Sequence, residues 1–125
     1  MPKKILVVED SLDTREILHL YLKMEGFTVV TACDGREGLY MADSERPDII
    51  ITDINMPNLD GFELIRQLRT QKDFKDLPII ALTAYGFEER DNAIRAGANR
   101  AATKPLHLES VIDDINELLD EQKKK

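Results

Sequence analysis

The sequence predicts an α/β fold with a doubly wound, five-stranded parallel sheet, and two observations favour this class. Short apolar runs rich in β-branched residues recur along the chain, and segments with the spacing of amphipathic helices lie between them. Strand and helix alternate five times in this way with short connections, which is typical of parallel β-α units rather than of a sandwich or a bundle. We therefore expect helices on both faces of the sheet.

The predicted strands are apolar runs bounded by polar residues. They cover residues 5–8, 27–30, 49–51, 77–82 and, with the weakest pattern, 100–103. An uninterrupted apolar run indicates a strand that is buried on both faces. None of the runs approaches the length of about 20 residues that a membrane-spanning helix requires. We therefore expect no membrane insertion.

The first predicted helix has an apolar face and a glycine at its end. The face is made by Ile17, Leu18, Tyr21 and Leu22. Gly26 follows in the position of a C′ glycine, which ends a helix in a left-handed conformation. Further along, the pair Asp34-Gly35 predicts a turn.

Capping residues mark the later helices. We expect Asp60 to cap the third helix, with Glu63 reaching back toward it as in a capping box. We expect Gly97 to end the fourth helix. The last helix has an apolar stripe that runs from Val111 to Leu119.

Length, composition and charge bound the domain organisation. The 125 residues, of which 42% are hydrophobic and 33% charged, suit one globular domain over 1–125. The chain has no internal repeat, linker or shift in composition, and helical spacing reaches almost to its end, so we expect no output domain. A net charge of −7 disfavours a broad contact with the phosphate backbone of nucleic acid.

The sequence also predicts a cytoplasmic protein. Cys33 is the only cysteine, so the chain cannot form an internal disulfide or a thiolate zinc site. We expect Cys33 to be a small, semi-buried residue, and His19 and His107 to lie at the surface or its boundary. The first apolar run is only four residues long, which is too short for a signal peptide.

Polar side chains stand at the end of four predicted strands. Glu9 and Asp10 follow the first, Asp53 the third, Thr83 the fourth and Lys104 the fifth. In an open parallel sheet the carboxyl ends of the strands form one edge, and ligands bind there where the strand order reverses. We therefore expect these side chains to converge.

Three converging carboxylates repel one another unless a cation lies between them. Oxygen ligands of this kind suit Mg²⁺, which commonly shares its shell with a phosphate group. A carboxylate can act as the nucleophile toward phosphorus and form an aspartyl phosphate, while metal, lysine and hydroxyl stabilise the transferring oxygens. The site therefore favours phosphoryl transfer.

Taken together, these residues resemble the receiver domain of response regulators in two-component signalling, and the resemblance covers essentially the whole chain. The matching positions are Glu9 and Asp10 as the acidic pair, Asp53 as the phosphoacceptor, Thr83 as the hydroxyl switch, and Lys104-Pro105 as the lysine followed by a cis proline. The segment from Asp53 to Gly61 is similar to the family's loop, which implies that Asn55 gives its backbone carbonyl to the metal.

The resemblance implies strand order 2-1-3-4-5 and a stand-alone signalling phosphoacceptor rather than an enzyme. A histidine kinase or a histidine phosphotransfer protein would place a phosphoryl group on Asp53, with Mg²⁺ as cofactor, as in a phosphorelay. A change of surface would then act on a separate downstream effector protein. The domain would assist only its own phosphorylation and dephosphorylation.

Two further positions bear on the lifetime and the switching of such a domain. By resemblance, Asn55 and Tyr85 control the access of water to the acyl phosphate, and a bulky Tyr85 is expected to slow hydrolysis. Three residues before the lysine, where the family usually has an aromatic side chain, this chain has Ala101. We therefore expect weaker coupling between Thr83 and the surface made by the fourth helix, the fifth strand and the fifth helix.

Other interpretations of the same residues were weighed. Asp10 or Ser11 can simply cap the first helix. A phosphatase of the haloacid dehalogenase kind also uses Asp and Mg²⁺, but that family has a second Asp where this chain has Asn55. A flavodoxin-like FMN carrier needs glycines and hydroxyls after the first strand, where Glu9 and Asp10 would repel a phosphate. We favour the receiver domain because helix capping does not require these residue types at four separate strand ends.

Overall fold

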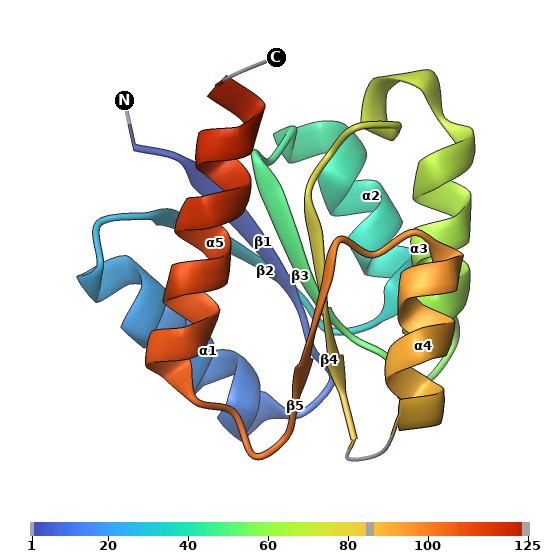
Figure 1. The fold of residues 1–125 in the computed structure, drawn as a ribbon, viewed down its shortest axis with the longest axis horizontal. Helices are drawn as coiled ribbons and strands as arrows, with labels where there is room; N and C mark the ends of the chain where they lie inside the picture. The colour runs from blue at the N-terminus through green and yellow to red at the C-terminus, as the bar shows by residue number, and fades with distance from the viewer. Residues whose placement is uncertain (1, 85–86, 124–125) are drawn as a thin grey trace.

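The computed structural model describes residues 2–84 and 87–123 and consists of five successive β-α units (Figure 1). The strands are β1 (Lys4–Val8), β2 (Thr28–Ala32), β3 (Ile49–Asp53), β4 (Ile79–Thr83) and β5 (Arg100–Thr103). The helices are α1 (Leu12–Met24), α2 (Gly35–Glu45), α3 (Gly61–Thr70), α4 (Phe87–Ala96) and α5 (Leu108–Lys123), with a 3₁₀ turn, η1 (Lys72–Phe74), after α3. Within the described ranges, no helix has both the length and the apolar character needed to cross a bilayer.

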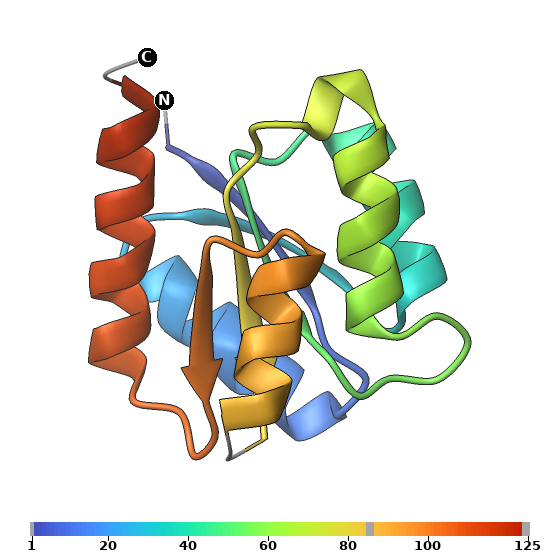
Figure 2. The same ribbon diagram turned by 45° about the vertical axis from the view of Figure 1, so that its right-hand side comes forward.

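The five strands form one parallel sheet in the order β2-β1-β3-β4-β5, which confirms the predicted fold class and strand order. Helices α1 and α5 cover one face, and α2, α3 and α4 cover the other (Figure 1). Figure 2 shows β5, the edge strand, lying between α4 and α5. The strand order reverses between β1 and β3, where such sheets bind ligands.

Each face of the sheet has its own apolar core, because side chains of a strand alternate between the two faces. Leu6, Val8 and Ile50 pack toward α2 and α3, together with Leu64 and Leu68 of α3. The residues that face α1 and α5 are Ile5, Val7, Ile49, Ile51, Ile80 and Leu82. The central strands are thus buried on both sides, as their uninterrupted apolar sequences predict.

Most helix ends lie where the sequence places them. The side chain of Ser11 caps α1, and Asp60 caps α3 by accepting a hydrogen bond from the Glu63 N–H at 2.9 Å. Gly26, which follows the C-cap of α1, and Gly97, which directly follows α4, have positive φ angles of 97° and 127°. Both glycines therefore end helices as predicted.

The structure corrects four local expectations. Asp34-Gly35 is not an isolated turn, because Asp34 accepts a hydrogen bond from the Glu37 N–H at 2.8 Å and thereby caps α2. Cys33 is exposed rather than semi-buried, since it lies beyond the end of the edge strand β2. Ile17 is 56% exposed, because only Leu18 and Leu22 of the expected face are buried. Two strands begin later than predicted, at Thr28 and Ile79.

Candidate phosphoryl and metal site

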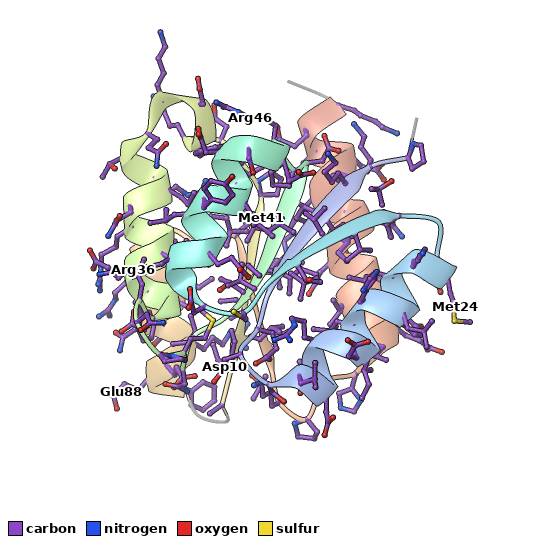
Figure 3. The ribbon with its side chains drawn as sticks, turned by 180° about the vertical axis from the view of Figure 1, so that it is seen from behind. Asp10, Met24, Arg36, Met41, Arg46 and Glu88 are labelled. Carbon is purple, nitrogen blue, oxygen red and sulfur yellow. The ribbon has the colours of Figure 1, made fainter. Side chains whose placement is uncertain are left out.

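The polar side chains predicted to converge do lie at one end of the sheet. Glu9 and Asp10 follow β1, Asp53 and Thr83 are the last residues of β3 and β4, and Lys104 follows β5. The strands are parallel and in a register that aligns these ends. Figure 3 shows Asp10 at the lower end of the molecule, near the start of α4.

The three carboxylates are close enough to share one ion. One carboxylate oxygen from each of Glu9, Asp10 and Asp53 lies within 4.8 Å of the other two. Glu9 is fully buried and Asp53 is only 4% exposed, whereas Asp10 is exposed. The cluster therefore has a buried base and an open side.

Both oxygens of the Asp53 carboxylate accept hydrogen bonds. Its Oδ1 accepts from the Ile54 N–H at 2.8 Å, and its Oδ2 accepts from Lys104 Nζ at 3.1 Å. The start of α3 packs directly against the end of β3, because a Cβ at Gly61 would lie 2.3 Å from the Asp53 carbonyl oxygen. A glycine at position 61 thus permits the chain to return from the loop to the backbone at the end of β3.

Lys104 supplies the positive charge of the site. Burial lowers its pKa, but the hydrogen bond and charge of Asp53 and the charge of Glu9 outweigh burial, so its pKa is raised. Its Nζ also lies 3.6 Å from Glu9 Oε1. The Lys104–Pro105 peptide bond is cis, as the resemblance implies.

Glu9 is held in an unfavourable place for a carboxylate. Burial raises its pKa to about 7; the Ser11 N–H, which donates to Oε2 at 3.0 Å, lowers it, and the nearby charge of Asp53 raises it. Its other oxygen, Oε1, is buried and accepts no hydrogen bond from any residue that the structure describes. A buried acceptor without a partner is costly, so a cation at this oxygen would relieve the cost.

Thr83 and Asn55 flank this group of carboxylates. The Thr83 hydroxyl is buried, and within residues 2–84 and 87–123 it has no hydrogen-bond partner. The Asn55 side chain is exposed, and its Nδ2 donates to Glu89 Oε2 at 3.4 Å. Tyr85 lies outside the described residues, so its expected shielding role stays a prediction.

The sequence did not point to three participants of the site. They are the backbone N–H groups of Ser11 and Ile54 and the carboxylate of Glu89, which accepts from the Ala84 N–H at 2.7 Å. Backbone donors leave no signature in a sequence. Glu89 is one of several acidic residues in α4, and nothing in its spacing separates it from Glu88.

The cluster fits Mg²⁺ by the chemistry of its donors. All three side chains offer carboxylate oxygens, which Mg²⁺ prefers, and an exposed side leaves room for the waters and phosphate that complete its octahedron. Glu9 Oε1 accepts no hydrogen bond from the described residues, which is a further sign that the protein alone does not satisfy the site.

Comparisons with known proteins identify the family of the chain. The response regulator receiver domain family matches residues 5–116. Response regulator MprA of Mycolicibacterium vanbaalenii is 44% identical over 120 residues, which are 95% of this chain and 51% of that protein. The chain thus spans about half the length of this curated relative.

Solved structures of receiver domains are also similar to the whole chain. A putative response regulator from Chloroflexus aurantiacus superposes with a TM-score of 0.93 and 31% identity, covering 96% of this chain and 99% of that one. The receiver domain of the sensor histidine kinase PA1611 from Pseudomonas aeruginosa superposes with a TM-score of 0.89 and 30% identity, covering 96% and 99%. That protein has a magnesium ion coordinated in its active site cleft.

Proposed function

Because this chain belongs to the response regulator receiver domain family, we propose that it accepts a phosphoryl group onto Asp53 and relays a signal through its surface. The observation that carries this assignment is the setting of Asp53. Its carboxylate is nearly buried, held by the Ile54 N–H and Lys104, and placed beside two further carboxylates. Of the three acidic residues, only Asp53 touches the lysine at hydrogen-bond distance.

The reaction is a substitution at phosphorus. One carboxylate oxygen of Asp53 attacks the phosphorus, and an O–P bond forms as the bond from phosphorus to the donor breaks. With a phosphohistidine donor, the electron pair of the P–N bond leaves on the imidazole. Hydrolysis later returns the carboxylate and releases inorganic phosphate.

In this proposal, two side chains stabilise the phosphoryl oxygens. Lys104 already lies 3.1 Å from Asp53 and is positively charged, so it can follow one of these oxygens as the O–P bond forms. The buried hydroxyl of Thr83, which has no hydrogen-bond partner among the described residues, can donate to another. A donor that is aligned before the reaction costs little reorganisation when charge develops.

Mg²⁺ is the cofactor that we assign to the carboxylates. Glu9, Asp10 and Asp53 would hold it together with the backbone carbonyl of Asn55, and Glu9 would act through a water. When bound, the ion neutralises charge on the transferring group. Three carboxylates, one Mg²⁺ and the Lys104 ammonium then sum formally to zero, which lets an anionic phosphoryl group approach.

We assign the partners as a histidine kinase or a histidine phosphotransfer protein on the donor side and an effector protein on the output side, all in the cytoplasm. A hollow of about 270 Å³ beside the site supports a protein donor. It is lined by Thr14, Ile17, Leu18, Lys104, Pro105, Leu106 and Leu108. A partner seated on these mainly apolar side chains would lie next to Lys104 and within reach of Asp53.

Intact mass spectrometry tests the assignment. Wild type, Asp53→Ala and the control Asp120→Ala, an exposed position at the far end of α5, are incubated with acetyl phosphate and Mg²⁺. Wild type and the control should each gain the mass of one phosphoryl group, and Asp53→Ala should gain none. Stable labelling of Asp53→Ala would refute the assignment.

A second variant separates the protein donor from the small one. Ile17→Asp should slow phosphorylation by a histidine phosphotransfer protein that phosphorylates wild type, because it places a charge on the apolar hollow. Its phosphorylation by acetyl phosphate should match wild type. An equal loss with both donors would instead indicate damage to the site.

A further inference from the structure

The side chain of Glu89 ties helix α4 to the carboxyl edge of the sheet. Its Oε1 accepts a hydrogen bond from the backbone N–H of Ala84 at 2.7 Å, and its Oε2 accepts from Asn55 Nδ2 at 3.4 Å. Ala84 directly follows β4, and Asn55 lies two residues beyond Asp53. Glu89 therefore bridges the ends of β3 and β4 from outside the sheet.

The N–H that Glu89 occupies is part of the phosphoryl site. Ala84 is the neighbour of Thr83, whose buried hydroxyl lacks a partner within the described ranges. In the sheet, Asp53 is paired with Leu82 of β4. Thr83 and Ala84, which follow Leu82, therefore lie just beyond the level of the phosphoacceptor. The oxygens of a phosphoryl group on Asp53 would therefore compete for the Ala84 N–H, which already donates to the Glu89 carboxylate.

We propose that Glu89 is a phosphorylation-sensitive latch: the phosphoryl group displaces its carboxylate from the Ala84 N–H and so releases the first turn of α4. The inference rests on the proposed phosphorylation of Asp53. A phosphoryl group carries nearly two negative charges at neutral pH and strong acceptor oxygens. It therefore repels Glu89 and competes with it for the same donor.

The latch gives this chain an output route that does not need an aromatic residue in β5. The position three residues before Lys104 is Ala101, which has only a methyl group to move. Glu89, by contrast, makes a charged hydrogen bond in one state and loses it in the other, which is the differential contact that a switch requires. The released turn begins with Phe87, which is 82% exposed and available to a partner.

Ordinary helix capping does not account for this bond. An acidic residue in the first turn of a helix interacts favourably with that helix's own N–H groups. Glu89 instead reaches past the helix start at Phe87 to Ala84, at the end of a strand. The bond therefore joins two elements rather than closing one.

Hydrogen exchange of backbone amides, followed by NMR, tests the latch. The proteins are wild type, Glu89→Ala, Glu89→Gln and the matched control Glu88→Ala, whose exposed side chain makes no hydrogen bond to the described residues. Each is measured with Mg²⁺ alone and with Mg²⁺ and beryllium fluoride, which mimics a phosphoryl group. The uptake of a real phosphoryl group from acetyl phosphate is followed by mass in parallel.

In wild type and Glu88→Ala, the mimic should speed exchange of amides 91–94 about tenfold, because their carbonyl acceptors lie in the first turn of α4. In Glu89→Ala these amides should exchange fast from the start, with little further change. Glu89→Gln keeps the acceptor but not the charge, so it should respond more weakly than wild type.

The possible failures are distinct. If wild type gains a phosphoryl group on Asp53 but amides 91–94 exchange alike with and without the mimic, the latch is wrong while the proposed function stands. If Glu88→Ala behaves like Glu89→Ala, the effect belongs to the helix terminus and the latch is also wrong. If wild type gains no phosphoryl group, both proposals fall together.

Discussion

The two ends of the parallel sheet differ in how their buried polar groups are satisfied. At the amino end, polar backbone groups are paired with side chains from neighbouring segments. The N–H of Lys4 donates to Asp48 Oδ2 at 2.8 Å, and the N–H of Ile79 donates to Asn99 Oδ1 at 2.8 Å. At the carboxyl end, Glu9 Oε1 and the Thr83 hydroxyl are buried and have no hydrogen-bond partner among the residues described.

The difference separates a stabilising end from a functional one. Each bond at the amino end satisfies a polar group that folding removes from water. Figure 3 shows how far the two ends lie apart, with Arg46 at the amino end and Asp10 at the carboxyl end. The carboxyl end keeps like charges together and donors unused, which costs stability and leaves binding capacity for an ion and a phosphoryl group. We therefore expect substitutions at the carboxyl end to change mainly phosphorylation and metal binding, and substitutions at the amino end to change mainly stability.

The largest effect is expected at the carboxyl end, from Asp10→Ala. Asp10 is exposed, so stability should change little, but a direct metal ligand is lost. The rate of Mg²⁺-dependent phosphorylation by acetyl phosphate should fall by at least about 100-fold. Stopped assays analysed by intact mass give the rate, with chelated metal as the reference. Normal phosphorylation of Asp10→Ala with the metal chelated would contradict the metal assignment.

The next effect concerns stability and pH, and it arises from Glu9. Folding raises the pKa of Glu9 from 4.5 to about 7, so the folded protein keeps the proton that the unfolded chain loses. Without metal, this contribution to the free energy of unfolding is complete below about pH 4.5 and is lost as pH rises through 7. The loss is about 3 kcal/mol.

Glu9→Gln should remove this loss because a carboxamide does not ionise. In chelator, urea unfolding should show wild type losing stability between pH 5 and 7.5 relative to the variant. Addition of Mg²⁺ should narrow the difference at pH 7.5, since the ion relieves the buried charge of wild type alone. Parallel stability curves of the two proteins would contradict the burial argument.

At the amino end, Asn99→Ala should cost stability and leave phosphorylation unchanged. The substitution removes the acceptor for the Ile79 N–H and for Arg69 Nη2, which donates to it at 3.0 Å. The expected loss is about 1.5 kcal/mol, because water can replace part of the lost bonding at this exposed side chain. Urea unfolding measures the loss, and the acetyl phosphate assay is the control. A variant that was stable but not phosphorylated would break the division between the two ends.

The fold could be predicted from the sequence because the same pattern of apolar strand and amphipathic helix repeats along the chain. Every strand but the edge strand β5 contains a clear apolar run, and Gly26 and Gly97 mark helix ends by a conformation that other residues avoid. Asp34-Gly35 failed as a predicted turn because Asp34 caps a helix instead, and both roles use the same residue type. Ile17 failed as a core residue because α1 buries only a narrow stripe.

The site was accessible only as a set of residues. The sequence placed Glu9, Asp53 and Lys104 at strand ends, and topology brought them together. It did not indicate that one oxygen of Glu9 lacks a partner, or that Glu89 reaches the Ala84 N–H. These facts depend on distances of a few ångströms between segments far apart in sequence, which spacing along the chain does not specify.

The smallest expected effect comes from Ala101→Tyr and sharpens the account of the carboxyl end. Ala101 lies in the edge strand β5, beside α4 and α5, and is paired with Ala81 of β4. An aromatic ring there could move into the space that Thr83 leaves when its hydroxyl turns to a phosphoryl oxygen. Sedimentation with and without beryllium fluoride should show the phosphorylation-dependent change in self-association enlarged by about fivefold.

The double variant Ala101→Tyr with Glu89→Ala decides whether two routes operate. If the ring carries the signal independently of the latch, the double variant should keep most of the enlarged response, because the two effects add when sites act separately. If the ring acts only on an α4 that Glu89 has positioned, the response should fall below that of Ala101→Tyr. A wild type that already shows a large shift, unaffected by Glu89→Ala and Tyr85→Ala, would instead place the signal outside both α4 and the segment after β4.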